Sequence, residues 1–514
     1  MRLHSCFIAI FSLLSGNLVL AANDSIELRV MSFNVWYGGD EVSLARTGEA
    51  IRAANADIVG LQESDRNLER IAVAAGMPYV DPRRRIISHW PLFDSGTGVR
   101  TEPGTSPYST TGLDQDSLHA WVMVRPGKVV AVANVHLSNA PSGLGAARNG
   151  GTPGEVRAIE NLSRVVETLP LTHLAELTKS GYPVFLTGDF NTASHLDWTA
   201  ATHASRDDVP FAFDWPVTRT LADAGFRDSY REAHPDPLQS PGYTWTPGAP
   251  HPHSDHERAR DRIDYVFTTG KTETLASQIV GEAGNPVVDI EISPWPSDHR
   301  GVVSTFRLEP AAAPPMISVT PRRLVENGAV QVRTWDPSGA TWTAMIAPRG
   351  GSLEDALIGV HEMPHDYQRS IPMSTLGLAP GDYDAILVDE SGEIIARDGF
   401  TIVADNAQPE LMAVNATVAP GKPIQVRWRN APGDLRDWVG LYRAGEVDVT
   451  RYIAFAYTEA SVSGKTELSV PELEPGEYEL RLLHDETYVV LAKTAITIVD
   501  QGDTQSRQRA PAGS

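Results

Sequence analysis

A short apolar strand that ends in an acid and an amide constrains the fold of this chain most strongly. Residues 183–191 read Pro-Val-Phe-Leu-Thr-Gly-Asp-Phe-Asn, and their apolar part predicts a buried strand that ends at Gly188. Side chains two positions apart in extended backbone point the same way, so Asp189 and Asn191 are expected to stand side by side. Sheet enzymes usually carry their chemistry at such strand ends. The alternative is a structural turn held by the two polar side chains.

Polar residues recur at the ends of other apolar segments in the first part of the chain. Six of them lie in or beside predicted strands: Asn34, Glu63, His136, Asp264, Asp298 and His299. Each has a structural alternative when taken alone, since Glu63 could cap the next helix and His136 could be packed in the core. Segments with helical spacing separate the strands. We therefore expect an α/β fold of two packed mixed sheets with helices outside, over residues 26–308.

Further strands, a loop and a helix are predicted in the segments between these residues. A strand is predicted at 85–92 and a hairpin at 120–137 around Pro126-Gly127. A glycine-rich rim loop is predicted at 141–154, followed by one long amphipathic helix at 155–179 that leads into the central strand.

The N-terminus has the composition of a secretory signal peptide. Residues 1–22 combine a polar start, an apolar stretch and small residues before a cleavage position. An uncleaved membrane anchor is the alternative, but the apolar run is short for a membrane span. The only cysteine, Cys6, lies inside this segment, so the mature chain is expected to have no thiol for a disulfide or for catalysis. We expect an exported protein of the bacterial periplasm or the extracellular medium.

The C-terminal part of the chain contains an internal repeat. Three motifs recur after 94 to 96 residues: Gln-Val-Arg at 331–333 and 425–427, Pro-Gly-x-Tyr at 380–383 and 475–478, and Thr-Ile-Val at 401–403 and 497–499. Trp342 is matched to Trp438, and both are expected to pack inside. Short alternating strands and Pro-Gly turns predict two β-sandwich modules, at 316–404 and 409–500.

The segments that flank the two modules have the composition of connecting or terminal chain. A linker is predicted at 311–315, where three alanines precede two prolines. Residues 501–514 are polar with glycine and proline and are predicted to be a disordered tail.

The charge balance limits the range of partners. The chain of 514 residues carries 65 acidic and 43 basic residues, for a formal net charge of −22. Such a charge disfavours non-specific duplex binding, which needs clustered lysine and arginine, and Arg83-Arg84-Arg85 is the only basic triplet. A small anionic substrate is not excluded, because a bound divalent cation reverses the local field.

The collected polar residues have the composition of a metal-dependent phosphoesterase site. Carboxylate and amide oxygens are the ligands that Mg²⁺ prefers. Phosphate-ester cleavage needs such a cation, a base that takes a proton from water, and a donor for the leaving oxygen, and the set supplies all three. The Gly-x-Ser-x-Gly motif of serine hydrolases does not occur in the sequence.

The ordered set resembles the endonuclease/exonuclease/phosphatase superfamily, whose members are similar to deoxyribonuclease I. The resemblance runs from about residue 26 to residue 306 and rests on seven motifs: Ser-Phe-Asn-Val at 32–35, Leu-Gln-Glu at 61–63, Ser-His-Trp-Pro at 88–91, Asn-Val-His-Leu at 134–137, Gly-Asp-Phe-Asn at 188–191, Arg-Ile-Asp-Tyr at 262–265 and Ser-Asp-His at 297–299. It implies a four-layer α/β sandwich and a metal-dependent phosphoric ester hydrolase.

The resemblance also implies a role for each residue. Glu63, together with Asn34 and Asp298, would hold Mg²⁺, with Mn²⁺ or Ca²⁺ as alternatives. The number of metal ions stays open.

The remaining residues would act on water and phosphate. Asp189 and Asn191 would position the attacking water or a phosphate oxygen. His299, oriented by Asp264, would be the base or a phosphate ligand, and His136 would stabilise the pentacoordinate phosphorus or assist the leaving oxygen. Whether Asp189 or His299 is the base stays open.

Several substrates remain compatible with this chemistry. A small or lipid-derived phosphate mono- or diester is favoured by the acidic charge; an extracellular nuclease or a sphingomyelinase-like phospholipase C is the alternative. The phospholipase would require an exposed aromatic hairpin, for which Trp215 and Trp245 are candidates. An inactive scaffold is disfavoured because every expected residue is present.

Two further features have competing interpretations. A second Ser-Asp-His tripeptide at 254–256 is interpreted as a solvated rim loop rather than a second site. The C-terminal modules are interpreted as spacers, with binding to a surface or partner as the alternative.

Overall fold

The computed structural model describes most of the chain. It covers residues 25–499 except 65–66, 95–117, 246–259, 338–342, 361–366, 435–436, 459–460, 472 and 485–487. The expected signal peptide and C-terminal tail, the tripeptide at 254–256 and Trp342 lie outside the described residues. In the part of the chain that is described, no helix has the length and apolar character needed to cross a membrane.

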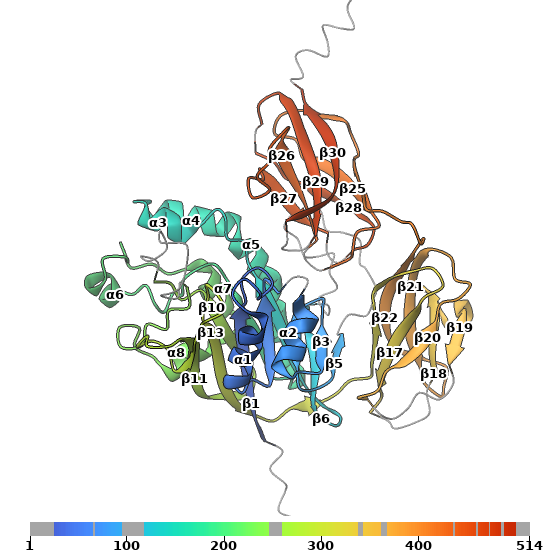
Figure 1. Ribbon diagram of the computed structural model, residues 1–514, viewed down its shortest axis with the longest axis horizontal. Coiled ribbons are helices and arrows are strands. Elements are labelled where there is room, and N and C mark those ends of the chain that lie inside the picture. Colours follow the sequence, from blue (N-terminus) through green and yellow to red (C-terminus); the bar gives the residue numbers. More distant parts are fainter. Residues whose placement is uncertain are drawn as a thin grey trace, which may run out of the picture.

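Two seven-stranded mixed sheets form the N-terminal part of the molecule (Figure 1). The first sheet has the order β12-β11-β13-β1-β2-β4-β3, with β1 (Ile26–Asn34), β2 (Ile58–Gln62), β3 (Tyr79–Asp81), β4 (Ile86–Ser88), β11 (Thr272–Glu282), β12 (Ile290–Ile292) and β13 (Gly301–Leu308). The second has the order β5-β6-β7-β8-β10-β9, with β14 beside β7; its strands are β5 (Leu92–Asp94), β6 (Ala120–Arg125), β7 (Lys128–His136), β8 (Val184–Asp189), β9 (Arg227–Asp228), β10 (Asp264–Thr269) and β14 (Ala311–Ala312).

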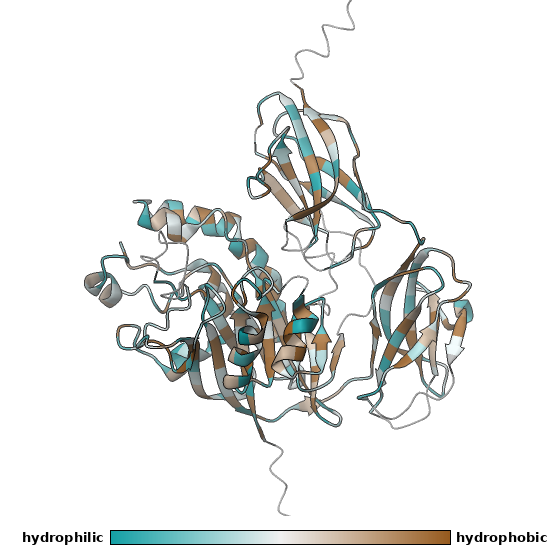
Figure 2. Cartoon of the chain, viewed as in Figure 1, coloured by the Kyte–Doolittle hydropathy of each residue, from teal (hydrophilic) through white to brown (hydrophobic). Residues whose placement is uncertain are grey.

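The two sheets pack face to face through an apolar core. Leu28 and Val30 of β1 share this core with Val130 of β7, and the rings of Phe185 and Phe306 lie 4.9 Å apart across it. Removing each such side chain from water stabilises the fold by about 1.5 to 3 kcal/mol. The strands of these sheets are largely brown, hence apolar, in Figure 2, and β2 and β8 are buried along their whole length, so the outer face of each sheet is also covered.

Helices cover both outer faces and complete four layers. On the first sheet lie α1 (Leu44–Ala53) and α2 (Leu68–Ala75), and near the second lie α4 (Pro153–Leu162), α5 (Arg164–Thr168), η4 (Leu169–Ser180) and α7 (Pro216–Asp223). Short helices α3 (Gly143–Arg148), α6 (Ala200–Ser205) and α8 (Ser229–Ala233) fill the loops. The predicted α/β sandwich of two mixed sheets is confirmed.

The predicted long helix at 155–179 is wrong. It is divided into α4, α5 and the 3-10 helix η4. The break falls at Ser163, whose φ of −124° and ψ of −97° are not helical, and whose hydroxyl donates to the carbonyl of Ile159 at 2.7 Å. Local hydrogen bonds of serine compete with helical ones in this way. The rim loop at 141–154 also contains α3, which Ser142 caps by accepting from the N–H of Gly145.

The predicted strand at 85–92 and the predicted linker also differ from the structure. The strand is two short strands, β4 and β5, which belong to different sheets, so the chain crosses between the sheets near Pro91. Proline fits this position because it has no N–H for a sheet ladder. The linker at 311–315 begins with β14, in which Ala311 pairs with Val129 of β7.

The remaining residues form β-only sheets in two sandwich-like modules. Module 1 contains β15 (Met316–Thr320), β16 (Arg323–Val325), β17 (Ala329–Trp335), β18 (Thr343–Pro348), β19 (Ile358–Val360), β20 (Ile371–Ser374), β21 (Gly381–Val388) and β22 (Ile394–Val403), with the 3-10 helix η6 (Leu353–Asp355). Module 2 contains β23 (Glu410–Ala413), β24 (Thr417–Val418), β25 (Ile424–Arg429), β26 (Trp438–Arg443), β27 (Ala454–Tyr457), β28 (Gly464–Leu468), β29 (Gly476–His484) and β30 (Val489–Ile498).

The two modules share one strand order. Each has a three-stranded sheet, β15-β17-β20 or β23-β25-β28, and a five-stranded sheet, β16-β22-β21-β18-β19 or β24-β30-β29-β26-β27. Both five-stranded sheets carry a bulge at the same place. Just after the bulge, Trp438 pairs with Leu483 and Thr343 pairs with Val388, so the structural counterpart of Trp438 is Thr343 rather than Trp342.

Candidate active site

Three neighbouring strands of the second sheet align three of the predicted residues. His136 ends β7 and lies opposite Asp189 in the parallel pair β7–β8, and Asp189 lies opposite Asp264 in the antiparallel pair β8–β10. His136 Nε2 is 3.5 Å from Asp189 Oδ2. Strand register therefore gathers an imidazole and two carboxylates at one edge of the sheet.

Strand β8 ends at Asp189, one residue later than predicted, and the backbone turns at Asn191. Gly188 lies inside β8 and its φ is not positive; a Cβ atom there would lie 2.5 Å from the carbonyl oxygen of Val135, so close strand packing requires the glycine. The left-handed residue is Asn191, with φ of 50°. Its N–H donates to Asp189 Oδ1 at 2.9 Å and its Nδ2 donates to the carbonyl of Leu137 at 2.9 Å. The Asx turn and the predicted site are thus the same structure.

The first sheet contributes Asn34 and Glu63. Asn34 ends β1 opposite Gln62 of β2, and Glu63 follows directly. The Nδ2 atom of Asn34 donates to Glu63 Oε1 at 3.0 Å and to Asp189 Oδ2 at 3.1 Å, while the N–H of Tyr37 donates to Glu63 Oε2 at 3.0 Å. One amide therefore bridges the carboxylates of the two sheets, and a direct bond from Asn34 to a metal stays a prediction.

His299 is held from both sides. Its Nδ1 is 2.9 Å from Asp264 Oδ2, and its Nε2 faces Asp189 Oδ2 at 3.7 Å. Its backbone N–H donates to Ser297 Oγ at 3.1 Å, and that hydroxyl donates to the carbonyl of Asn34 at 2.7 Å. These bonds fix the ring with Nε2 directed at the carboxylate of β8.

Burial and mutual charge shift the pKa values in this group. Burial raises the pKa of Asp189, and the charge of Asp264 raises it further, against the lowering effect of His299 and His136. Burial alone would lower the pKa of His299, but Asp264 and Asp189 together hold it well above its ordinary value. The two carboxylates therefore favour the protonated form of the buried His299 ring.

Asp298 has the properties of a cation ligand. Burial raises its pKa to about 7; His299 opposes the rise, and the charges of Glu63 and Asp189 add to it. Its Oδ1 atom is buried and has no hydrogen-bond partner among the described residues. An unpartnered carboxylate oxygen beside two further carboxylates is costly without a counter-charge, so the donor set fits a hard divalent cation.

Another group in the same site also has the composition of a metal centre. Asp189, Asp264 and His299 each offer a ligand atom, and these atoms lie within 4.8 Å of one another. All three side chains are buried. Seven of the eight predicted residues are thus linked by hydrogen bonds or close polar contacts, and Asp298 is coupled to them through the charges of His299, Glu63 and Asp189; the individual roles stay predictions.

Sequence reasoning missed a buried hydrogen-bond network that joins the sheets next to this site. Gln62 Nε2 donates to Asn134 Oδ1 at 2.6 Å, and Thr187 Oγ1 donates to the same oxygen at 3.0 Å. Asn134 and Thr187 stand two residues before His136 and Asp189 on the same strands. The signal was available, because a polar residue two positions before a catalytic candidate faces the same way.

The backbone is strained on the Glu63 side of the site. Trp36, Tyr37 and Glu63 have positive φ values of 57°, 43° and 56°. Left-handed backbone is unfavourable for bulky residues and tends to persist at functional sites. Tyr37, whose side chain is 54% exposed, is a further candidate that the motifs did not identify.

Two sequence features that could favour the alternative substrates, Trp215 and the basic triplet at 83–85, are not exposed surfaces in the structure. Trp215 is fully buried in the core beside Trp198, so it is not an exposed membrane-binding residue. Arg84 is buried and paired with Asp81 at 2.7 Å, and Arg85 is also buried, so the basic triplet does not form an exposed cationic surface. Trp245 lies 6.5 Å from His299, ring to ring, within the site itself.

A second acidic and histidine group lies in module 2. Asp434, Asp437 and His484 place ligand atoms within 4.8 Å of one another. Asp437 Oδ2 accepts the N–H groups of Gly433 and Asp434, and His484 Nε2 is 2.9 Å from Asp434 Oδ2. These bonds stabilise the loop before β26.

A four-layer sandwich of two mixed sheets with carboxylates and histidines at adjoining strand ends defines a hydrolase fold of the phosphoesterase class. The profile of the Endonuclease/Exonuclease/phosphatase family matches residues 31–299, and the chain belongs to this family. An uncharacterized protein of Caenorhabditis elegans is 29% identical over 300 residues, which cover 54% of this chain and 91% of that protein.

Solved structures of this fold are also similar to the chain. An endonuclease/exonuclease/phosphatase of Beutenbergia cavernae is 21% identical and covers 73% of this chain and 99% of its own, with a TM-score of 0.34. The mannosyl-6-phosphatase of Bacteroides thetaiotaomicron is 16% identical and covers 54% of this chain and 99% of its own, with a TM-score of 0.33.

Proposed function

We propose that this protein is a metal-dependent phosphoesterase that hydrolyses phosphate esters by attack of water on phosphorus. The observation that carries the proposal is the position of Asp189, whose Oδ2 atom faces His136, His299 and the amide of Asn34 at once. A buried carboxylate in this position can accept a proton from water, and the imidazoles and the amide beside it can donate hydrogen bonds to a phosphate anion.

The metal site is proposed to consist of Glu63 and Asp298, with Asn34 beside them. A divalent cation, Mg²⁺ by preference, would neutralise a non-bridging phosphate oxygen and polarise the phosphorus. Glu63 is held for this purpose by Asn34 and by the N–H of Tyr37, so its carboxylate is pre-oriented.

Asp189 is proposed as the base and His299 as a phosphate ligand. The Nδ1 atom of His299 is engaged by Asp264, which favours the protonated ring and leaves the Nε2–H as a donor to an anion. Asp189 is fixed by the N–H of Asn191, so the oxygen directed at the histidines is the one available to water. His136, at the end of β7, would assist the leaving oxygen.

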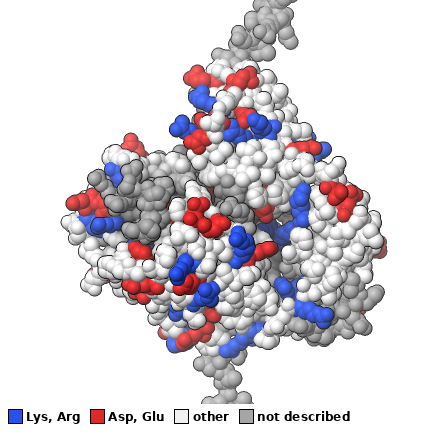
Figure 3. Space-filling view, in the orientation of Figure 1, with Lys and Arg blue, Asp and Glu red and all other residues white. Residues whose placement is uncertain are grey.

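A small or lipid-derived phosphoester is the proposed substrate class. Acidic and basic side chains are interspersed over the described part of the face in Figure 3, without a continuous basic stripe. A nuclease needs such a stripe to hold the phosphate backbone. The burial of Arg84 and Trp215 likewise weakens the nuclease and phospholipase alternatives.

A phosphoester panel tests the proposal. The full-length protein would be assayed on p-nitrophenyl phosphate, bis-p-nitrophenyl phosphate, duplex DNA and sphingomyelin, with Mg²⁺, Mn²⁺ or Ca²⁺ and with a chelator. We expect hydrolysis of a small ester that the chelator abolishes and Mg²⁺ restores. Hydrolysis that continues in excess chelator would show that the metal assignment is wrong, and preferred cleavage of DNA or sphingomyelin would replace the substrate class.

Export is proposed from the composition of residues 1–22. Expression with the natural N-terminus in a bacterial host, followed by mass determination of the recovered protein, tests it. A mature chain that begins near residue 23 in the periplasm or medium is the expected result, and an intact N-terminus in the cytosol would contradict it.

A further inference from the structure

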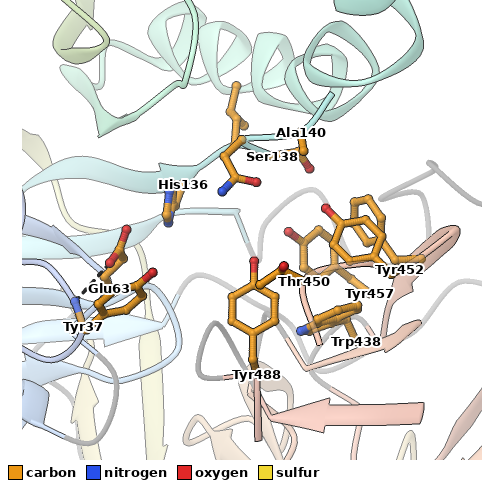
Figure 4. A pocket seen from close by; sticks show the side chains of 13 residues that line it. Tyr37, Glu63, His136, Ser138, Ala140, Trp438, Thr450, Tyr452, Tyr457 and Tyr488 are labelled. Atoms are coloured by element: carbon orange, nitrogen blue, oxygen red, sulfur yellow. Dashed lines mark hydrogen bonds between the residues drawn. The ribbon is translucent and has the colours of Figure 1, made fainter. Parts of the chain in front are cut away.

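A pocket of about 360 Å³ lies between the candidate active site and module 2. Its catalytic side includes Tyr37, Glu63, His136 and the segment 137–140. Its other side, which we name the aromatic wall, consists of Trp438, Tyr452, Phe455, Tyr457 and Tyr488. Figure 4 shows Tyr488 standing between the two sides with its hydroxyl directed into the space. Residues of module 2 therefore border the same cavity as two proposed site residues.

The placement of module 2 is supported by electrostatic neighbours in the first part of the chain. Burial raises the pKa of Tyr452, and the nearby charge of Glu167 raises it further while Arg164 lowers it. Glu167 also accepts the N–H of Ser138 at 2.9 Å, and Arg164 donates to the carbonyl of Ser138 at 2.6 Å. The floor of the pocket at Ser138 is thus anchored to α5, beside which Tyr452 lies.

The aromatic wall is not a requirement of the sandwich fold. Phe455 pairs with Gly440 on β26, and the corresponding pair in module 1 is Gly359 with Met345 on β18. Module 1 therefore builds the same strand with a glycine where module 2 has a phenylalanine. The counterpart of Trp438 is likewise Thr343, a small residue.

Tyr488 gives the sharpest contrast. The pairs Gly381–Ile402 and Gly476–Ile498 correspond in the two modules, and the 96-residue offset between Ile402 and Ile498 makes Gly392 the counterpart of Tyr488. Gly392 has φ of 84°, which suits glycine, but Tyr488 has φ of 56°, which is costly for a bulky residue. A tyrosine retained in a glycine conformation indicates a function of its side chain.

The chemistry of the pocket favours an uncharged group that carries hydroxyls. Among the described residues that line the pocket, the side chains of Glu63 and His136 belong to the catalytic side, and neither lysine nor arginine occurs. The rest offers aromatic faces together with the hydroxyls of tyrosine, Thr450 and Ser138 and the amide of Asn139. Hydroxyls both donate and accept, and ring faces attract the C–H groups of a sugar.

A flat base is a poorer match to the wall. Trp438 meets Tyr452, Phe455 and Tyr488 at 73°, 86° and 88°, all edge to face. Such pairs leave no parallel slot into which a nucleobase could stack.

We propose that the aromatic wall of module 2 completes the substrate site and binds a sugar ring esterified to the phosphate, so that sugar phosphates are the substrate class. This inference rests on the proposed phosphoesterase function. The phosphate end of the substrate lies at Glu63 and His136, and the sugar lies against Tyr488 and its neighbours. Module 2 is therefore part of the active site and not a spacer.

Binding without turnover provides the first test. Full-length protein in excess chelator would be titrated with methyl hexosides of glucose, mannose and galactose, and with a nucleoside, and followed by saturation-transfer NMR. We expect saturable binding of at least one hexoside. Tyr488→Gly should weaken it about tenfold or more. Asn430→Gly, which replaces another left-handed residue of module 2 (φ of 56°) outside the pocket, should not change it.

Two outcomes of the titration overturn the proposal. Hexoside binding that is undetectable, or equal in wild type and Tyr488→Gly, removes the wall as a sugar site. Nucleoside binding that is tighter than hexoside binding and lost in Tyr488→Gly would replace the sugar by a base. If Tyr488→Gly does not fold, as judged by circular dichroism, Tyr488→Phe and Tyr452→Ser take its place with the same criteria.

Substrate selectivity provides the second test and separates the two proposals. The ratio of kcat/KM for hexose 6-phosphates to kcat/KM for glycerol 3-phosphate should fall about tenfold in Tyr488→Gly and stay constant in Asn430→Gly. An unchanged ratio in Tyr488→Gly overturns the inference while leaving the phosphoesterase intact. Absence of hydrolysis of every ester refutes the proposed function, and the binding titration then still decides whether the wall holds a sugar.

Discussion

The Nδ1 atom of His299 lies 2.9 Å from the Oδ2 atom of Asp264, and both side chains are buried. Asp264 begins β10 in the second sheet, while His299 precedes β13 in the first. The pair therefore joins the two sheets at the site, and its geometry depends on how the whole sandwich is packed.

Asp264→Asn should lower kcat far more than it raises KM. An asparagine keeps the shape but does not stabilise the imidazolium, so a loss of about 100- to 10,000-fold in kcat is expected from the usual size of acid–base contributions. Steady-state kinetics on the best small ester measures it. The matched control is Asp214→Asn, whose partner Arg219 is at the surface; a similar loss in that control would show that charge removal in general is responsible.

Glu63→Gln and Asp298→Asn should each raise the Mg²⁺ concentration needed for half-maximal activity. Each removes one anionic oxygen donor from the proposed metal site, and ligand charge sets the affinity for hard cations. Isothermal titration of Mg²⁺ into the protein measures the change without turnover. Glu273→Gln, an exposed partner of Arg307, serves as the control. Metal affinity equal to wild type in both variants would place the metal elsewhere, with the Asp189, Asp264 and His299 group as the next candidate.

Gly60→Ala should destabilise the N-terminal sandwich. Gly60 lies on β2 where the sheets meet, and a Cβ atom there would overlap the side chains of Thr187 and Asn134. Overpacking of this kind costs about 1 to 3 kcal/mol. Thermal denaturation followed by circular dichroism measures the lowered Tm. Gly154→Ala, whose new atom would meet only Thr152 Oγ1 at 3.9 Å, is expected not to lower Tm, because alanine is also the better helix former in α4. A Tm of Gly60→Ala that is not lower than that of wild type contradicts the close contact between the sheets.

Acid should unfold the protein partly through Asp197. Burial alone would raise the pKa of Asp197, but the charges and hydrogen bonds of Arg262 and Arg231 lower it below the ordinary 3.8. Because the folded pKa is the lower one, the ion pairs stabilise the fold above about pH 4, and this contribution is lost as the pH falls through the folded pKa.

Asp197→Asn tests this account directly. At neutral pH the variant should lose about 3 to 5 kcal/mol, because buried Arg231 loses its counter-charge and buried Arg262 keeps only its pair with Asp228. Its stability should then fall less steeply than that of wild type below about pH 4. Urea unfolding at several pH values measures both effects, and parallel pH profiles for the two proteins would contradict the assignment.

The sequence predicted the fold, and it predicted the polar residues of the site where each lies at the end of a strand that pairs with its neighbour in the sheet. Asp189, Asp264 and His136 end or begin strands, and a strand's end is visible as a change from apolar to polar residues. Strand neighbours then bring such ends together without further information. The proximity of residues within one strand or turn, such as Asp189 and Asn191, was also predicted, because it follows from local backbone geometry alone.

The failures have causes that the spacing of apolar residues does not reveal, and most of these causes are non-local. Gly188 is required by the carbonyl of Val135 on another strand and not by its own turn. The linker at 311–315 contains a strand because the pairing of β7 with β8 starts only at Ala131, so that Lys128 and Val129 at the start of β7 can pair with Ala312 and Ala311. The break in the helix at Ser163 accompanies a hydrogen bond from its hydroxyl to the carbonyl of Ile159, which the spacing of apolar residues does not reveal. The part of module 2 in the pocket was not predicted, since no motif connects Tyr488 with Glu63.

The common strand order of the two modules has an evolutionary consequence. A duplicated sandwich supplies a spare copy, and both copies keep a left-handed backbone at this position, with Gly392 in one and Tyr488 in the other. Divergence after the duplication can therefore change what enters the cleft without altering the strand ends that carry the chemistry. Relatives that keep those strand ends but differ beyond residue 409 should have inherited one reaction and acquired separate specificities.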